Sequence, residues 1–284
     1  MNEFKNKVAV ITGAASGIGR SIAEKFAHEG IKVVIADIEA NALGRTEETL
    51  KSLGANVISI VSDVSKIDDV KLLAQETIEH FGAVHILVNN AGVGFAGNST
   101  TTLWESSLSE WKWILGVNLW GIIHGIYVFV PIMLKEDFEC IIVNTASMAG
   151  LVSPVIGTSL YSITKHAVVA LSESLKSELG LLKSKIKVLA LCPGFVSTNL
   201  TQSERNRPPE LIEKAVTNPR FEIFKRGYQQ SIESGLPPEK VADILFRALS
   251  NEIFYISTDH HRSIKRMVTN RMEAIIQDLE KHLE

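Results

Sequence analysis

One stretch near the N-terminus decides the fold: Lys7-Val-Ala-Val-Ile-Thr-Gly13-Ala-Ala-Ser-Gly17-Ile-Gly19. Its first six residues are mostly apolar and include three apolar β-branched side chains, which predicts a buried strand. The glycines lead into residues 20–28, where Ile22, Ala23 and Phe26 have helical spacing. A strand, a glycine turn and a helix in this order form a cradle for phosphate. Glycine lets the backbone approach a ligand closely, and the helix N-terminus offers free N–H groups.

The glycine spacing does not by itself identify a cofactor. Dinucleotide-binding turns usually read Gly-x-Gly-x-x-Gly, whereas this chain has Gly-x-x-x-Gly-x-Gly. A plain turn therefore stays open until the following residues are considered. Lys32-Val-Val-Ile-Ala-Asp37 is a second apolar run, so residues 7–37 are predicted to form a strand–helix–strand unit.

Asp37 closes that second strand and is the first candidate for cofactor choice. A carboxylate there can accept hydrogen bonds from the adenosine ribose hydroxyls, and it would repel a 2′-phosphate. Ile38 and Ser16 carry no charge, which favours NAD over NADP, although Arg20 and Arg45 lie nearby in the sequence. The alternative is that Asp37 only caps the next helix.

Apolar runs and helical patterns alternate along most of the remaining chain. Strands are expected over 56–61, 84–88, 139–144, 187–192 and 252–257, and helices over 40–53 and 67–81. This alternation predicts an α/β fold with a doubly wound parallel sheet, Rossmann-like, in a single domain over 1–284. Ligands bind beyond the C-terminal ends of such strands. Four polar or glycine positions are expected at those ends: Gly13, Asp37, Asp63 and Asn89.

Composition excludes several classes of protein. A net charge of −3 without a basic run leaves no electrostatic footprint for nucleic acid. Two cysteines, both inside apolar runs, suggest no disulfide framework and fit a reducing compartment. The N-terminus lacks the apolar core of a signal peptide. We therefore expect a cytoplasmic protein.

Residues 113–134 lack any charged side chain and are long enough to span a bilayer. The segment nevertheless contains Asn118, His124, Pro131 and three glycines, and its flanks show no positive-inside asymmetry. We interpret it as a helix buried in the protein or in a subunit interface, with Ser109 as a plausible N-cap, although the neighbouring residues lie equally near the boundary. Asn118 needs hydrogen-bond partners there, and it either pins the helix or holds a water near an active site.

Tyr161 and Lys165 are four residues apart and therefore share one face of a helix that we expect over 161–182. An ammonium beside a phenol favours the phenolate and lowers the tyrosine pKa, so the pair could move a proton near neutral pH. By spacing alone the pair is more often an exposed coincidence than a functional pair. Ser147 follows a strand and could bond a substrate oxygen; no Gly-x-Ser-x-Gly elbow marks it as a nucleophile.

Taken together, these residues resemble the short-chain dehydrogenase/reductase family. The matching segments occur in the family's order over about residues 5–200, and the glycine spacing is the family's own variant. They are Thr12 to Gly19, Asp63, Asn89-Asn-Ala-Gly92, Asn118, Ser147, Tyr161-x-x-x-Lys165 and Pro193-Gly194.

The resemblance implies a role for each position. For catalysis it implies Tyr161 as acid/base, Lys165 as the group that lowers its pKa, Ser147 on the substrate oxygen and Asn118 tethering a water. For cofactor binding it implies Gly13, Ser16, Gly17, Ile18, Asp37, Asp63, Val64, Asn90, Ala91, Gly92, Tyr161, Lys165, Pro193, Gly194, Val196 and Thr198. The implied activity is NAD(H)-dependent interconversion of a secondary alcohol and a ketone, with the hydride chemistry belonging to the nicotinamide. No resident metal is expected, because His260-His261 has no further ligands at a recognisable spacing.

The second half of the chain departs from the family pattern. Residues 199–235 are expected to form a substrate lid, whose Leu200, Leu211, Phe221, Phe224 and Tyr228 hint at a hydrophobic substrate. The alternative is an ordinary surface excursion. An amphipathic helix is expected over about 262–283, within a C-terminal extension over about 260–284. It puts the standard packing of the family's tetramer in doubt. The expected assembly is a homodimer or a homotetramer. The alternative function is a dinucleotide-binding sensor or scaffold without catalysis.

Overall fold

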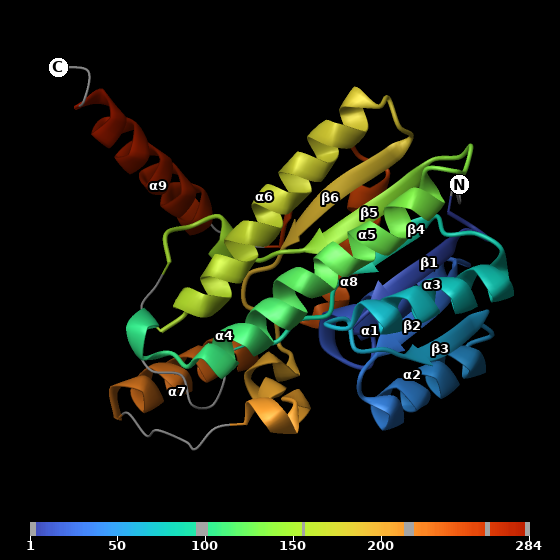
Figure 1. Ribbon diagram of the computed structural model, residues 1–284, viewed down its shortest axis with the longest axis horizontal. Coiled ribbons are helices and arrows are strands. Elements are labelled where there is room, and N and C mark those ends of the chain that lie inside the picture. Colours follow the sequence, from blue (N-terminus) through green and yellow to red (C-terminus); the bar gives the residue numbers. More distant parts are fainter. Residues whose placement is uncertain (1–3, 95–101, 155–156, 213–218, 259–261, 282–284) are drawn as a thin grey trace.

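A seven-stranded parallel sheet forms the centre of the molecule (Figure 1). The computed structural model describes residues 4–94, 102–154, 157–212, 219–258 and 262–281. The strand order is β3-β2-β1-β4-β5-β6-β7, and every neighbouring pair is parallel. The strands are β1 (Val8–Thr12), β2 (Lys32–Asp37), β3 (Val57–Val61), β4 (Ile86–Asn89), β5 (Cys140–Thr145), β6 (Ile186–Cys192) and β7 (Tyr255–Ser257). The predicted Rossmann-like sheet in one domain is confirmed.

Helices cover both faces of the sheet. On one face lie α1 (Gly17–His28), α2 (Ala40–Ser52) and α8 (Pro238–Leu249). On the other lie α3 (Ile67–Phe81), α5 (Gly121–Met133) and α6 (Ser159–Leu181). Within β1, Ala9 and Ile11 pack toward the first layer, and Val8 and Val10 pack toward the second. Burial on both faces explains why the strands read as continuous apolar runs rather than alternating ones.

The strand order reverses between β1 and β4. From β1 the chain winds outward through β2 and β3, and from β4 it winds the other way through β5, β6 and β7. The Thr12 hydroxyl joins the two strand ends, because it accepts hydrogen bonds from the backbone N–H groups of Asn90 at 3.0 Å and Ala91 at 3.1 Å. A crevice opens at this reversal, where open α/β sheets bind their ligands.

Several predicted boundaries were wrong by a few residues. The strand expected over 84–88 begins at Ile86. The strand expected over 252–257 has only three residues, Tyr255–Ser257, because it pairs only with the last three residues of β6. The helix α6 begins at Ser159, so Tyr161 lies in its first turn instead of opening it.

The long uncharged segment is a helix interrupted by a π-helical turn. It comprises α4 (Leu108–Leu115), the turn Gly116–Trp120 and α5. The N-cap is Ser107 and not Ser109, since the Ser107 hydroxyl accepts a hydrogen bond from the Glu110 N–H at 3.1 Å. By length and composition alone Leu108–Met133 could cross a membrane. A core helix of a soluble protein meets the same test, and 39% of its most apolar window is buried.

Short helices follow β6, and one long helix ends the chain. Two 3-10 segments (Asn199–Asn206 and Pro209–Leu211) and α7 (Pro219–Glu233) occupy the predicted lid region. The last helix, α9 (Arg262–Glu280), points away from the sheet (Figure 1). The Phe221 side chain and His260-His261 lie outside the described residues. Two further 3-10 turns are Leu103–Glu105 and Met148–Gly150.

Candidate active site

A cavity of about 450 Å³ lies at the C-terminal edge of the sheet. Residues that follow β1, β2, β3, β4, β5 and β6 all contribute to its wall. Every site residue predicted from the sequence lines this cavity except Asn118. The fold therefore brings together side chains that are spread over nearly two hundred residues of sequence.

The glycine turn forms one end of the cavity. Gly13 has φ +67° and Gly17 has φ +54°, which favour residues without a Cβ. A Cβ on Gly13 would lie 2.7 Å from the Ala91 Cα, so β1 and β4 could not approach as they do. The helix α1 begins at Gly17, and the Ser16 side chain makes no capping hydrogen bond. This helix N-terminus can therefore bind a phosphate.

Asp37 does not cap α2, whose N-cap is Glu39. Its two carboxylate oxygens accept hydrogen bonds from backbone N–H groups, Oδ2 from Ala15 at 2.9 Å and Oδ1 from Glu39 at 3.0 Å. Burial raises the pKa of Asp37, and these N–H groups act in the opposite direction. The carboxylate is thus held in place at the end of β2, beside the glycine turn.

Side chains after β3 and β4 complete this half of the wall. The Asp63 carboxylate accepts from the Ser65 hydroxyl at 2.7 Å, while the Val64 carbonyl contacts His124 Nδ1 at 2.8 Å. The Asn90 amide donates to the Thr12 carbonyl at 3.0 Å. These polar groups mostly bond backbone or neighbouring side chains, so the wall is formed before any ligand contacts it.

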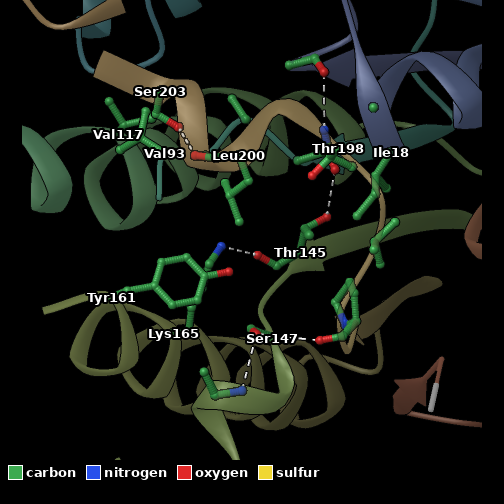
Figure 2. Close-up of a pocket in the computed structure, with 18 of the residues that line it drawn as sticks. Ile18, Val93, Val117, Thr145, Ser147, Tyr161, Lys165, Thr198, Leu200 and Ser203 are labelled. Carbon is green, nitrogen blue, oxygen red and sulfur yellow. Dashed lines mark hydrogen bonds between the residues drawn. The ribbon is translucent and has the colours of Figure 1, made fainter. Parts of the chain in front are cut away.

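Ser147, Tyr161 and Lys165 meet on the opposite side of the cavity. Figure 2 shows the Lys165 ammonium beside the Tyr161 ring and bonded to the carbonyl oxygen of Thr145, with an Nζ–O distance of 2.8 Å. The ammonium lies 5.6 Å from the centre of the Tyr161 ring. The Ser147 hydroxyl accepts from the Ala149 N–H at 3.1 Å, and it is hydrogen-bonded to Tyr161. A hydroxyl pair beside a buried ammonium can hold and transfer a proton.

The acidity of the tyrosine differs from the sequence-based expectation. Burial raises the pKa of Tyr161 to about 12, and its hydrogen bond with Ser147 opposes this rise. Burial also lowers the pKa of Lys165 to about 8. The expected lowering of the tyrosine pKa by the neighbouring lysine is not seen in this structure, because desolvation of the phenol outweighs the favourable groups.

Asn118 lies fully buried in the π-helical turn and does not line the cavity. Its Oδ1 accepts from the Val93 N–H at 2.8 Å, and its Nδ2 donates to the Val93 carbonyl at 3.0 Å and the Thr164 hydroxyl at 3.2 Å. The side chain thus joins three segments around Lys165. These contacts favour the pinning role among the two roles predicted for it.

Glu39 and Arg205 are site residues that the sequence did not indicate. The Arg205 guanidinium contacts the Glu39 carboxylate at 2.6 Å, although the two are 166 positions apart. The Asn206 amide donates to the same carboxylate oxygen at 2.8 Å. Glu39 is only partly buried, and its hydrogen bond with Arg205 holds the pKa of Glu39 below its ordinary value. All three residues line the cavity, so the pair joins β2 to the segment after β6 across its wall.

A further part of the lining is apolar or aromatic. Trp113 is buried on α4, and the Arg207 guanidinium lies 5.1 Å above its ring. The apolar lining comes from α4, α7, α9 and the loops: Trp113, Val152, Leu200, Tyr228, Ile232, Ile264 and Met267. Apart from Lys165, the charged lining residues lie near the ends of β2 and β3: Asp37 ends β2, Glu39 and Asp63 follow β2 and β3, and Arg205 bonds to Glu39. The cavity therefore has a polar part and an apolar part.

Comparison with known proteins agrees with this geometry. The short chain dehydrogenase family model matches residues 7–209. A short chain dehydrogenase/reductase from Burkholderia phymatum, solved in complex with NAD, is 44% identical and covers 98% of this chain and 97% of its own, with a TM-score of 0.92. The chain belongs to the short-chain dehydrogenase/reductase family and is an oxidoreductase of that class.

Curated relatives have varied names. A CLA biosynthesis dehydrogenase/reductase from Lactiplantibacillus plantarum is 34% identical over 281 residues, which is 98% of this chain and 96% of the relative. The diacetyl reductase [(S)-acetoin forming] of Staphylococcus epidermidis is 32% identical over 257 residues, 89% of this chain and 95% of the relative. These names share an oxidoreductase activity but no single substrate.

Proposed function

We propose that this protein interconverts a secondary alcohol and a ketone with NAD(H), using Tyr161 as the general acid/base. One observation carries the proposal: Ser147, Tyr161 and Lys165 meet on one wall of a cavity whose other wall is a glycine turn and a buried carboxylate. A protein that only binds a dinucleotide needs the glycine turn and the carboxylate. It does not need a group of side chains that can transfer a proton.

The polar part of the cavity fits a dinucleotide. The N–H groups at the start of α1 would hold the pyrophosphate, and Asp37 would accept from the adenosine ribose hydroxyls. Asp63 and Val64 would contact the adenine, and the run from Asn90 to Gly92 would extend along the cofactor. Pro193, Gly194, Val196 and Thr198 would surround the nicotinamide carboxamide.

NAD is favoured over NADP by the charges at the end of β2. Asp37 and Glu39 place two carboxylates where a 2′-phosphate would bind, and Ile38 between them carries no charge. Two arginines close to this carboxylate cluster are engaged, because Arg20 contacts Glu24 at 2.8 Å and Arg205 contacts Glu39. The similar Burkholderia phymatum protein, solved with NAD, supports the same choice.

The proton chemistry follows from burial. With its pKa near 12, Tyr161 keeps its proton at neutral pH and can donate it to a ketone oxygen, which Ser147 would hold by its hydroxyl. The chemistry that a bound nicotinamide would supply is hydride transfer, and the positive charge of its oxidised form would favour the tyrosinate of Tyr161 for alcohol oxidation. Lys165, held by Thr145, would present a donor to the cofactor ribose and to the phenol.

The substrate we propose is an uncharged, largely apolar alcohol or ketone. Its support is the apolar part of the cavity lining, including Trp113, Leu200, Tyr228 and Met267. Residues 199–235 would act as a lid over it, since Leu200 and Tyr228 from this region face the cavity.

We also propose a cytoplasmic homodimer or homotetramer that binds neither nucleic acid nor membrane. The apolar helix would then lie at a subunit interface, because Trp120 and Tyr127 on it are 52% and 69% exposed. Large apolar patches on soluble proteins commonly mark such contacts.

The decisive experiment is a panel of ketones and alcohols with NADH, NADPH and their oxidised forms, monitored by absorbance of the reduced nicotinamide. Tyr161→Phe should reduce kcat by at least a thousandfold while leaving the NADH dissociation constant within about threefold, since only the proton donor is removed. Appreciable residual turnover would refute the assigned acid/base. Tight NADH binding by the wild type without turnover on any substrate would instead favour the sensor or scaffold.

A further inference from the structure

The helix α9 begins at the cavity and ends in solvent. Ile264 in its first turn is buried and, with Met267, lines the cavity. Every residue from Met272 through Lys281 is exposed. Figure 1 shows the helix pointing away from the sheet and its covering layers. The outer half of α9 therefore has no burial partner within the described part of the chain.

That outer half nevertheless has an apolar face. Met272, Ile275, Ile276 and Leu279 are between 44% and 63% exposed, and their spacing places them on one side of the helix. Helices in water depend on packing of an apolar face for most of their stability. Four large exposed apolar side chains on consecutive turns indicate a surface that another molecule covers.

Charge along α9 indicates which molecule this is. The inner half carries Lys265, Arg266 and Arg271 and has no acidic residue from 264 to 271. The outer half carries the three acidic residues Glu273, Asp278 and Glu280, with Lys281 as its one basic residue in 272–281. A helix with opposite charges on its two halves is complementary to a reversed copy of itself. An anionic membrane surface would instead repel the exposed acidic half.

We propose that α9 docks antiparallel against α9 of a second copy of this chain, centred on Met272. In this arrangement Lys265 lies within one residue of the level of the second copy's Glu280, and Val268 at the level of its Ile276. A two-fold axis through the centre repeats both contacts, as an isologous interface requires. The tip of each helix then approaches the mouth of the other copy's cavity. The inference stands whether or not the proposed reaction is correct.

Disulfide trapping in the full-length protein tests the arrangement directly. Met272→Cys places a thiol at the centre, where two copies would meet, whereas Ala274→Cys places one on the opposite side of the same helix. The native Cys140 and Cys192 are buried and do not compete. After mild oxidation we expect at least tenfold more covalent dimer from Met272→Cys than from Ala274→Cys. Equal yields from the two variants, or none from either, would overturn the pairing.

A second measurement distinguishes self-association through the apolar face of α9 from binding of a membrane to the same face. Ile276→Glu should halve the molar mass measured by sedimentation equilibrium, or weaken the dimer at least tenfold, with unchanged circular dichroism. Wild-type mass in this variant would contradict the proposal. If vesicles of phosphatidylcholine and phosphatidylglycerol bind the wild type but not Ile276→Glu, and the mass is unchanged, a membrane is the partner and the proposal is wrong.

Discussion

The Lys165 ammonium donates a hydrogen bond to the backbone carbonyl of Thr145, with 2.8 Å between nitrogen and oxygen. Thr145 is the last residue of β5, so this bond fixes the only charged group of α6 that lines the cavity to the end of a central strand. Lys165 as a whole is 3% exposed, so its ammonium has lost most of its hydration. Its charge is therefore easily removed, which has consequences for the pH dependence of the reaction.

We predict that ketone reduction is lost as pH rises through about 8. Burial lowers the pKa of Lys165 to about 8, so its charge is complete well below that pH and disappears above it. Tyr161 keeps its proton over the same range, because burial raises its pKa to about 12. The value of kcat/KM for NADH-dependent reduction, which reports the free enzyme, should be level near pH 6 and fall about tenfold per unit above pH 8.

A matched variant identifies the group responsible for this fall. In Lys165→Arg the guanidinium stays charged at every accessible pH. We expect lower activity from this variant, because the longer side chain must fit a buried site, but no fall near pH 8. A wild-type profile that stays level to pH 10, or an unchanged fall in the variant, would show that Lys165 does not control the reaction.

Cofactor preference should be reversible at the end of β2. Replacing Asp37 by Ser and Ile38 by Arg removes the carboxylate and supplies a partner for a 2′-phosphate. We expect kcat/KM to fall at least tenfold with NADH and to rise at least tenfold with NADPH. The control is Asp37→Asn, which keeps the size of the side chain and one acceptor oxygen. It should lose activity with NADH but gain little with NADPH. A wild type that already prefers NADPH would contradict the assignment.

The contact between Glu39 and Arg205 should stabilise bound cofactor. The two side chains are 27% and 36% exposed, so their interaction is partly screened and worth on the order of 1 kcal/mol. Glu39→Gln and Arg205→Ala should each raise the NADH dissociation constant about two- to fivefold. The double variant should be no worse than either single one, because the same contact is lost.

An exposed ion pair far from the cavity provides the control for that experiment. Lys185 contacts Asp137 at 2.6 Å, and both are exposed. Asp137→Asn should leave NADH binding unchanged at all salt concentrations. If Asp137→Asn changes NADH binding as much as Glu39→Gln does, the effect comes from overall charge and not from the contact between Glu39 and Arg205. Additive effects of Glu39→Gln and Arg205→Ala would lead to the same conclusion.

The sequence predicted the sheet because burial on both faces leaves a clear apolar signature in each strand. The site residues were predictable for a related reason: parallel strands end at one edge, so polar residues at the end of a strand or directly after it gather there. Residues such as Asp37, Asp63 and Ser147 belong to this group. The limits of single elements were less certain, as the N-cap at Ser107 illustrates, since several nearby residues have similar capping ability.

Features that depend on contacts between distant segments were not predictable. Arg205 meets Glu39 across 166 positions, and the carbonyl of Thr145 that holds Lys165 leaves no trace in side-chain identity. The rise in the Tyr161 pKa depends on how completely neighbouring segments exclude water, which spacing along α6 cannot reveal. Asn118 was partly predictable. The sequence showed that its amide needs hydrogen-bond partners, but it did not show that these partners are Val93 and Thr164.

Gly19 gives the most direct test of how closely the glycine turn approaches β4. A Cβ at this position would lie 2.2 Å from the Gly13 carbonyl oxygen and 2.5 Å from Asn90 Nδ2. Gly19→Ala should therefore force the turn away from Asn90, destabilise the fold by about 1–3 kcal/mol and weaken NADH binding at least tenfold. Denaturant unfolding and NADH fluorescence measure the two effects.

The control glycine lies in the neighbouring helix. A Cβ at Gly44 in α2 would meet nothing within 4 Å, so only the helix preference of alanine remains. Gly44→Ala should stabilise the protein by about 0.5–1 kcal/mol and leave NADH binding unchanged. The two variants thus make the same chemical change with opposite expected signs. If Gly19→Ala binds NADH as the wild type does, the close packing of the turn against Asn90 is not what forms the phosphate site.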